Sequence, residues 1–155
     1  MNPTHNLHNS LITQIMCGMN PDIFKAYDIR GKYPNEINEK IVSDIIVTLI
    51  KNLKPKTIVI GHDARLSSPK LYKAATKELK HSNILKNIKI IKGGLMTTPM
   101  LYFLVNYFNA DLGIMITASH NPKEYNGLKI VGKNAIPISG KEIYKLVNQK
   151  LVNRN

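Results

Sequence analysis

Short apolar runs alternate along the chain with stretches whose apolar residues recur at helical spacing. The runs at 57–60, 88–91 and 111–116 are too short for helices and are bounded by turn residues, so each is predicted to be a buried strand. A helix is predicted where apolar residues recur every four positions, at Ile37, Ile41, Ile45, Leu49 and Leu53. Asn35 or Asn38 is expected to cap this helix.

Three further helix starts follow. Ser68–Pro69 and Thr98–Pro99 are each a hydroxyl residue followed by proline, a pair typical of a first helical turn. Ser139 and Glu142 have the spacing of a capping box before an apolar run. Strands and helices therefore alternate, which predicts an α/β fold, a three-layer sandwich with a mainly parallel mixed sheet.

The net charge of +12 would suit a nucleic-acid or anionic membrane partner if the basic residues were clustered. They are instead spread over predicted solvent-facing positions, without interleaved aromatic residues or a nucleic-acid-binding motif. No apolar run approaches membrane-spanning length. We therefore expect no specific nucleic-acid partner and no membrane partner, although a small phosphate-bearing ligand would still be attracted.

Residues 1–18 are rich in Asn, His and Thr with little periodicity, which predicts a disordered extension outside the fold. Residues 19–155 are long enough for one domain with its own core. The apolar stretch at 11–16 is short and lacks a basic flank, so a signal peptide is not expected. A single cysteine, Cys17, excludes an internal disulfide, and these features together predict a cytoplasmic protein.

The segment 117–122, Thr-Ala-Ser-His-Asn-Pro, presents a hydroxyl directly after a predicted buried strand. Downstream, Asn126–Gly127 is typical of a turn, and the apolar run that follows predicts a strand that brings Lys129 back toward Ser119. Ser119, His120 and Lys129 are therefore expected to converge. Taken alone, the same residues also fit a turn serine and an ordinary strand lysine.

Two other polar segments accompany predicted strands: 24–31, Phe-Lys-Ala-Tyr-Asp-Ile-Arg-Gly, and 61–67, Gly-His-Asp-Ala-Arg-Leu-Ser. In an open α/β sheet, ligands bind outside the carboxyl ends of the strands. The sequence predicts that both segments and the 117–122 loop meet at that edge.

The segment 117–122 closely resembles the phosphoserine loop of the α-D-phosphohexomutases, which move phosphate between C1 and C6 of hexose phosphates. Segments 24–31, 61–67 and 94–99 are similar to three further family motifs, in family order. The resemblance starts near residue 20 and covers the first of the family's four domains. It implies domain I of the phosphomannomutase/phosphoglucomutase branch. Phosphoglucosamine mutases share the phosphoserine loop, but their first motif usually differs from the 24–28 segment of this chain, so they rank second.

The resemblance implies that Ser119 carries a phosphoryl group, donates it to a hexose monophosphate, and takes back the other phosphate of the resulting bisphosphate. Lys129 matches the position of proton transfer near the sugar hydroxyl. For His120, loop orientation, proton exchange and a bond to the backbone stay open.

Arg30 is expected to clamp phosphate, because its planar fork suits phosphate oxygens, with a salt bridge to Asp28 as the alternative. Tyr27 is expected to line the site or simply to pack. The expected substrate or phosphate contacts are Arg30, Tyr27, Asp63, Arg65 and Asn121.

The family binds Mg²⁺ between the phosphoserine and an Asp-rich loop of its second domain, and this chain has no comparable run. Ser119, through its phosphate, is therefore the one metal ligand expected in this chain. The sugar-recognition and terminal phosphate-binding loops belong to the family's third and fourth domains. The chain alone is therefore expected to be inactive.

Two interpretations of function remain open. The first is an enzyme domain that acts on hexose phosphate, either truncated or completed by another chain that supplies the missing domains. The second is a decayed or split-gene fragment that acts as a non-catalytic binding or interaction domain. Mannose and glucose are not distinguished, because their contacts lie in the other domains.

Overall fold

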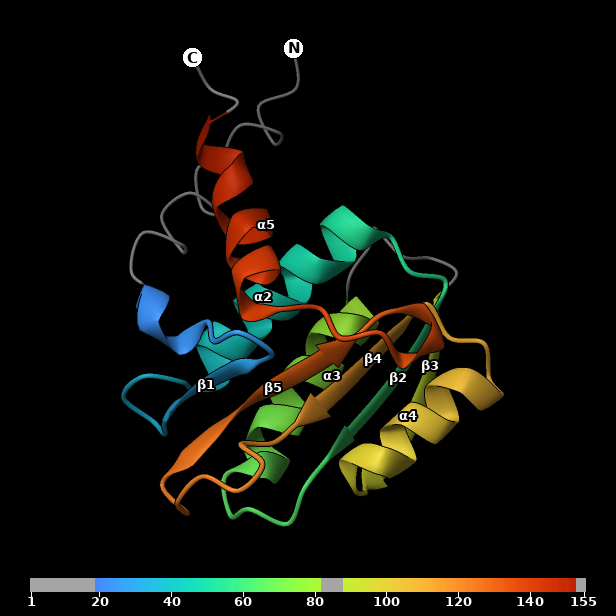
Figure 1. Cartoon of the computed structure of the whole chain (residues 1–155), viewed down its shortest axis with the longest axis horizontal. Helices are drawn as coiled ribbons and strands as arrows, with labels where there is room; N and C mark the ends of the chain where they lie inside the picture. Colours follow the sequence, from blue (N-terminus) through green and yellow to red (C-terminus); the bar gives the residue numbers. More distant parts are fainter. Residues whose placement is uncertain (1–18, 82–87, 153–155) are drawn as a thin grey trace.

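The computed structural model describes residues 19–81 and 88–152, so the prediction for residues 1–18 lies outside it (Figure 1). Five strands and four α-helices alternate in the described part of the chain. The strands are β1 (Ile29–Lys32), β2 (Thr57–His62), β3 (Lys89–Leu95), β4 (Leu112–Ile116) and β5 (Tyr125–Val131). The helices are α2 (Glu39–Leu53), α3 (Ser68–His81), α4 (Thr98–Tyr107) and α5 (Gly140–Val152), with short 3-10 turns η1 (Pro21–Ile23) and η2 (Lys133–Ala135).

The strands form one mixed sheet in the order β1-β5-β4-β2-β3. β2 pairs in parallel with both β3 and β4, whereas β5 pairs antiparallel with β4 and β1. Four strands therefore run in one direction and β5 runs against them. This confirms the predicted α/β fold with a mainly parallel mixed sheet.

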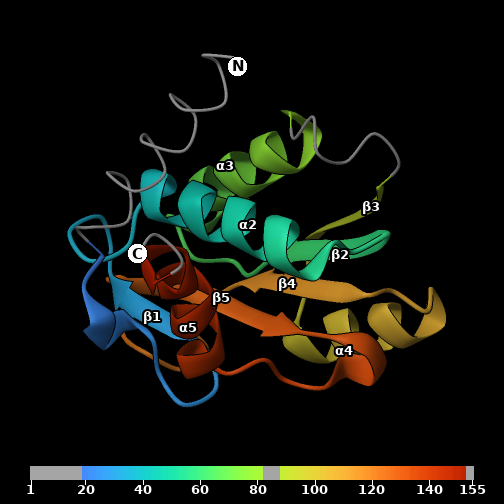
Figure 2. The same cartoon turned by 90° about the horizontal axis from the view of Figure 1, so that it is seen from above.

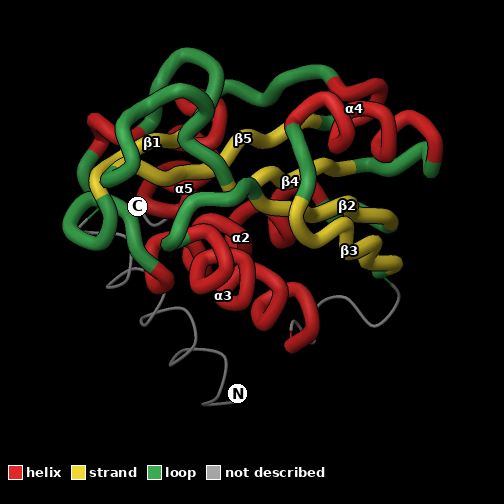
Figure 3. The backbone as a smooth tube through the Cα atoms, turned by 90° about the horizontal axis from the view of Figure 1, so that it is seen from below, coloured by secondary structure: helices red, strands yellow, loops and turns green. Residues whose placement is uncertain are grey.

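Helices cover both faces of the sheet (Figure 2). On one face, Ile58 and Ile60 of β2 belong to a core cluster with buried residues of α2, α3 and α5. On the other face, Val59 packs in a second cluster with Leu101 and Val105 of α4. Successive residues of β2 thus alternate between two apolar layers, as the pleat of a strand requires. Figure 3 shows the same three layers from below.

The face of α2 differs from its prediction. Asn38 caps the helix, since its side-chain oxygen accepts the N–H of Ile41 at 3.1 Å. Ile37 is buried but precedes the helix, and Leu53 is 40% exposed. Residues four apart rotate by about 40° at each step around a helix of 3.6 residues per turn, so a stripe of every fourth residue leaves the buried face. The buried residues of α2 are Val42, Ile45, Ile46, Thr48, Leu49 and Ile50.

The next two helices each begin one residue earlier than the predicted caps imply. Ser68 is the first residue of α3, and Thr97, not Thr98, caps α4 by accepting the N–H of Met100. The capping box of α5 is confirmed: Glu142 N–H donates to Ser139 Oγ, and Ser139 N–H donates to the Glu142 carboxylate.

Two predictions near the site are wrong. Asn126–Gly127 lies inside β5, because pairing with β1 and β4 on both sides overrides the local turn preference of this dipeptide. The segment 24–31 is predicted to lie at the carboxyl end of a strand, but residues 24–28 precede β1, which begins at Ile29. Of the three motif segments, only the loops after β2 and β4 leave carboxyl ends of strands, and Figure 1 shows them together at the lower edge of the sheet.

Candidate functional site

The loop between β4 and β5 holds Ser119 in an unusual backbone conformation. Its φ of 55° lies in the left-handed region, which non-glycine residues rarely adopt. Ala118 before it is buried, whereas Ser119 and His120 are exposed. Because the preceding strand β4 is wholly buried, the chain emerges from the core at this residue and presents its hydroxyl to solvent.

His120 lies beside the serine hydroxyl. Its Nδ1 is 3.3 Å from Ser119 Oγ, within reach of a weak hydrogen bond. Both residues line a cavity of about 730 Å³. Its other walls come from the loop after β2, from the end of β3 through the start of α4, and from the end of β4 and the residue after it: Asp63, Ala64, Leu95, Met96, Thr97, Thr98, Met100, Met115 and Thr117.

Asp63, in the loop after β2, directs its carboxylate to neighbouring protein groups. Oδ1 accepts the N–H of Arg65 at 3.0 Å and the hydroxyl of Ser68 at 2.6 Å. Oδ2 accepts the hydroxyl of Thr117 at 2.7 Å and lies 3.2 Å from Nε of Arg65. This arrangement does not support the expected substrate contact of Asp63, since both oxygens already hold two partners each.

Arg65 reaches from the same loop to residues 117–125, which carry Ser119 and are called the serine loop below. Nη1 donates to the carbonyls of Pro122 and Tyr125 at 2.7 and 3.1 Å. Nη2 donates to the carbonyls of Ser119 and Asn121 at 2.8 and 2.6 Å. The expected phosphate contact of Arg65 is likewise not supported, because its guanidinium is turned toward protein carbonyls.

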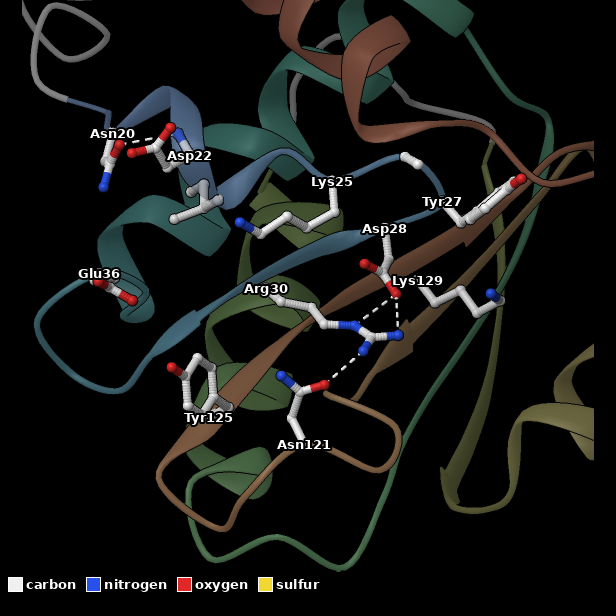
Figure 4. A pocket seen from close by; sticks show the side chains of 12 residues that line it. Asn20, Asp22, Lys25, Tyr27, Asp28, Arg30, Glu36, Asn121, Tyr125 and Lys129 are labelled. Atoms are coloured by element: carbon white, nitrogen blue, oxygen red, sulfur yellow. Dashed lines mark hydrogen bonds and ion pairs between the residues drawn. The ribbon is translucent and has the colours of Figure 1, made fainter.

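A second cavity, of about 640 Å³, lies along β1 (Figure 4). Arg30 stands between two partners in it: Nε and Nη2 contact Asp28 Oδ2 at 2.7 and 2.5 Å, and Nη1 donates to Asn121 Oδ1 at 2.5 Å. The salt bridge to Asp28, left open as an alternative, is present. Within the described residues, one N–H on each terminal nitrogen of Arg30 has no partner.

Lys129 lines this second cavity, together with Lys25, Tyr27 and Asn121. Lys129 is expected to converge with Ser119, but Ser119 lines the other cavity. Lys129 pairs with Met115 across β5 and β4, and Met115 lines the cavity of Ser119, so both side chains belong to one face of the sheet. No hydrogen bond joins Lys129 to Ser119 in the part of the chain that the structure describes.

Tyr27 and Asn121 take different positions. Tyr27 is 70% exposed and lines the second cavity, so it is a wall residue and not a packed one. Asn121 bridges the two motif segments, because its side chain accepts from Arg30 and its carbonyl accepts from Arg65. It therefore contacts both arginines through its oxygens.

Two residues of the site were missed by the sequence reasoning. Thr117 connects Asp63 to the backbone of Ser119 by hydrogen bonds, because its hydroxyl donates to Asp63 and its Oγ1 accepts the N–H of Ser119 at 2.9 Å. Asn126 is fully buried and donates to the hydroxyls of Ser67 and Ser68 at 2.7 and 2.9 Å. A buried asparagine needs partners, but local signals in its sequence favoured a turn, so only its tertiary contacts reveal this role.

The site offers few groups for a metal. No three His, Cys, Asp or Glu side chains are grouped to hold an ion within residues 19–81 and 88–152. The carboxylate that lines the cavity of Ser119, Asp63, already holds four protein contacts. Apart from a phosphate on Ser119, the residues present do not fit a metal centre.

In residues 19–81 and 88–152, no helix is long and apolar enough to cross a bilayer.

Sequence comparisons identify relatives along most of the chain. Residues 21–153 match the family described as phosphoglucomutase/phosphomannomutase, alpha/beta/alpha domain I. The protein named phosphohexose mutases from Xanthomonas campestris is 45% identical over 116 residues, which cover 75% of this chain and 25% of that protein. A phosphomannomutase of Escherichia coli is 45% identical over 117 residues, covering 76% and 25%. The chain thus spans about a quarter of the length of these relatives.

Other relatives agree in sequence and in fold. A phosphomannomutase from Klebsiella pneumoniae is 42% identical over 129 residues, which cover 83% of this chain and 76% of that protein. A crystal structure of a phosphoglucomutase/phosphomannomutase family protein from Burkholderia thailandensis superposes with a TM-score of 0.73 at 27% identity, covering 88% of this chain and 31% of that one. A structure from Thermus thermophilus gives 0.72 at 26% identity, covering 84% and 30%.

Proposed function

The chain belongs to the phosphoglucomutase/phosphomannomutase family, and we propose that it supplies the phosphoserine-bearing domain I of a hexose phosphate mutase. The relatives named phosphohexose mutases and phosphomannomutase support this assignment. The observation that carries it is the presentation of Ser119, whose exposed hydroxyl opens on a cavity while its backbone is bonded on both sides. Such a fixed, outward hydroxyl suits a group that must meet a substrate in one orientation.

In the proposed reaction, phosphorylated Ser119 gives its phosphoryl group to a hydroxyl of a hexose monophosphate. The bond from phosphorus to the sugar oxygen forms as the bond to Ser119 Oγ breaks, and the protein accepts the proton of the sugar hydroxyl. In the return step Ser119 Oγ attacks the other phosphate of the bisphosphate, and the leaving sugar oxygen regains a proton. The hydroxyl at C1 or C6 is thereby exchanged for a phosphate, and phosphoserine is restored.

We assign the proton transfer and the phosphate contact of this reaction to basic side chains. Lys129 and His120 are the proposed proton-transfer groups. Lys129 is the cross-strand neighbour of Met115, which lines the cavity of Ser119, and His120 lies beside the Ser119 hydroxyl. Arg30 keeps two N–H groups for phosphate oxygens while Asp28 and Asn121 hold its orientation. Tyr27 is proposed to line the substrate path from its exposed position.

The family generally uses a metal. A phosphate on Ser119 would supply hard oxygen ligands of the kind that Mg²⁺ prefers. The described residues add no free carboxylate to it, so we assign no step of this chain to a metal. The remaining ligands, and the contacts that choose the sugar, are proposed to come from the domains that the longer relatives have beyond their matched quarter.

A chimera tests the proposal. The matched segment of the Escherichia coli phosphomannomutase is replaced by that of this chain, and conversion of mannose 1-phosphate is measured. We expect activity that disappears on Ser119→Ala. A folded chimera without activity would favour the non-catalytic interpretation, in which the domain only binds.

A second experiment tests the partner. The unaltered chain is mixed with the remaining three quarters of the Escherichia coli protein as a separate polypeptide. Activity that appears only in the mixture would support completion by another chain. Failure of the mixture beside an active chimera would instead show that the segment is competent but needs covalent linkage.

A further inference from the structure

The guanidinium of Arg65 has no donor left for a ligand. Arginine carries five N–H groups. Nε faces the Asp63 carboxylate, and each terminal nitrogen donates to two carbonyls of the serine loop. The side chain is 14% exposed, so these contacts are largely shielded from water.

The four carbonyls that Arg65 binds all lie between residues 119 and 125. They therefore belong to one short segment of the chain, and the planar guanidinium binds all four at once. Backbone carbonyls that point at one another repel, because each carries a partial negative charge. A cation placed among them removes this repulsion and makes the compact turn favourable.

Asp63 completes the same frame from the other side of Ser119. Its Oδ2 accepts the hydroxyl of Thr117, whose oxygen in turn accepts the Ser119 N–H. The amide of Ser119 is thus bonded through Thr117, and its carbonyl is bonded by Arg65. Both peptide groups that flank the serine are fixed, while its hydroxyl, beside His120 Nδ1, lines the cavity.

This frame accounts for the backbone of Ser119. A non-glycine residue in the left-handed region persists only where its surroundings hold it. We propose that Arg65 is a positioning residue, which sets the Ser119 hydroxyl for phosphoryl transfer by gathering the loop carbonyls and does not itself bind phosphate. The effect of Arg65 on catalysis rests on the proposed function. Its effect on the conformation of the loop does not.

The chain offers a matched pair of substitutions. Arg65→Met removes the donors but keeps an unbranched apolar side chain. Lys123→Met removes the same charge from an exposed position in the serine loop itself. Arg65→Lys keeps the charge, but an ammonium has three N–H groups and cannot reproduce the fork.

Hydrogen exchange of the full chain measures the loop directly. In Arg65→Met we expect the amides of residues 118–124 to exchange roughly tenfold faster or more than in the unaltered chain, with β4 amides unchanged. Lys123→Met should match the unaltered chain, and Arg65→Lys should resemble Arg65→Met. Added guanidinium at millimolar concentration should restore slow exchange in Arg65→Ala. Unchanged loop exchange in Arg65→Met, or equal acceleration in the loop and in β4, would overturn the proposal.

The chimera supplies the catalytic readout. Arg65→Met is expected to lower kcat by about a hundredfold with KM within about threefold, since misplacement of a reacting group impairs the chemical step more than binding. A raised KM with unchanged kcat would mean that Arg65 binds the substrate, and would contradict the positioning role. If the chimera with Arg65 intact is inactive, the proposed function fails, while the exchange experiment still decides whether Arg65 holds the loop.

Discussion

The backbone of Gly127 touches the carbonyl of Ile29 so closely that a Cβ on the glycine would lie 1.8 Å from that oxygen. β1, which carries Arg30, approaches β5, which carries Lys129, at this point. The absence of a side chain on Gly127 therefore allows the two strands, whose residues Arg30 and Lys129 both line the second cavity, to approach this closely.

Gly127→Ala should destabilise the protein by about 3 kcal/mol or more, because the backbone oxygen in its way cannot rotate aside as a side chain would. Urea unfolding of the two proteins measures the difference. Gly132→Ala is the control: its φ is −86° and the nearest atoms are 3.9 Å from the added carbon, so its stability should stay within about 1 kcal/mol. Equal stability of the two variants would show that β1 is not held at this distance.

Asp111 gives the fold a pH dependence. Burial would raise the pKa of its carboxyl, but the N–H groups of Lys56 and Thr57 and the ammonium of Lys133 together lower that pKa. A pKa lowered in the folded state means that the ionised carboxylate stabilises the fold above the ordinary value of 3.8, and that this contribution is lost as the pH falls through the folded pKa.

Asp111→Asn should therefore be less stable than the unaltered protein at pH 6, and the gap should shrink as the pH falls below about 4. Unfolding free energies at several pH values test this. A gap that widens toward acid would mean that folding raises the pKa of Asp111 instead of lowering it.

Lys129→Met should lower kcat of the chimera by about a hundredfold or more, as expected when a proton-transfer group is removed. Lys141→Met, at an exposed position of α5, removes the same charge outside the two cavities and should leave the rate unchanged. Equal rates for both variants would leave Lys129 as an ordinary strand lysine.

The chain without other domains should show no multiple turnover with glucose 1-phosphate and Mg²⁺ in a coupled assay. The reason is that the described residues supply no metal cluster and the chain spans about a quarter of the length of its relatives from Xanthomonas campestris and Escherichia coli. Sustained conversion that Ser119→Ala abolishes would contradict this expectation.

The sheet and the meeting of two loops could be predicted from the sequence, because both follow from regular patterns. The runs at 57–60 and 111–116 mark β2 and β4, and the carboxyl ends of parallel strands share an edge. Asn126–Gly127 could not be placed in this way. Its local preference is for a turn, and only the pairing of β5 with two neighbours keeps it extended.

The roles of Asp63 and Arg65 were also beyond sequence reasoning. Motif similarity brought both residues to the site, but the partners that tie them to the serine loop lie more than 50 positions away. The same similarity suggested a phosphate contact for Arg65. In the folded chain its guanidinium donates hydrogen bonds to four carbonyls of the serine loop. These contacts indicate that Arg65 holds the loop and does not bind phosphate.

The phosphorylation state of Ser119 is the decisive measurement for the proposed function. The chimera is incubated with glucose 1,6-bisphosphate and digested, and the peptide that contains residues 117–122 is sequenced by mass spectrometry. We predict one phosphoryl group on Ser119, lost again when excess glucose 6-phosphate is added. A chimera that interconverts hexose phosphates without ever carrying phosphate on Ser119, or that does so equally well after Ser119→Ala, would contradict the proposed role of this serine.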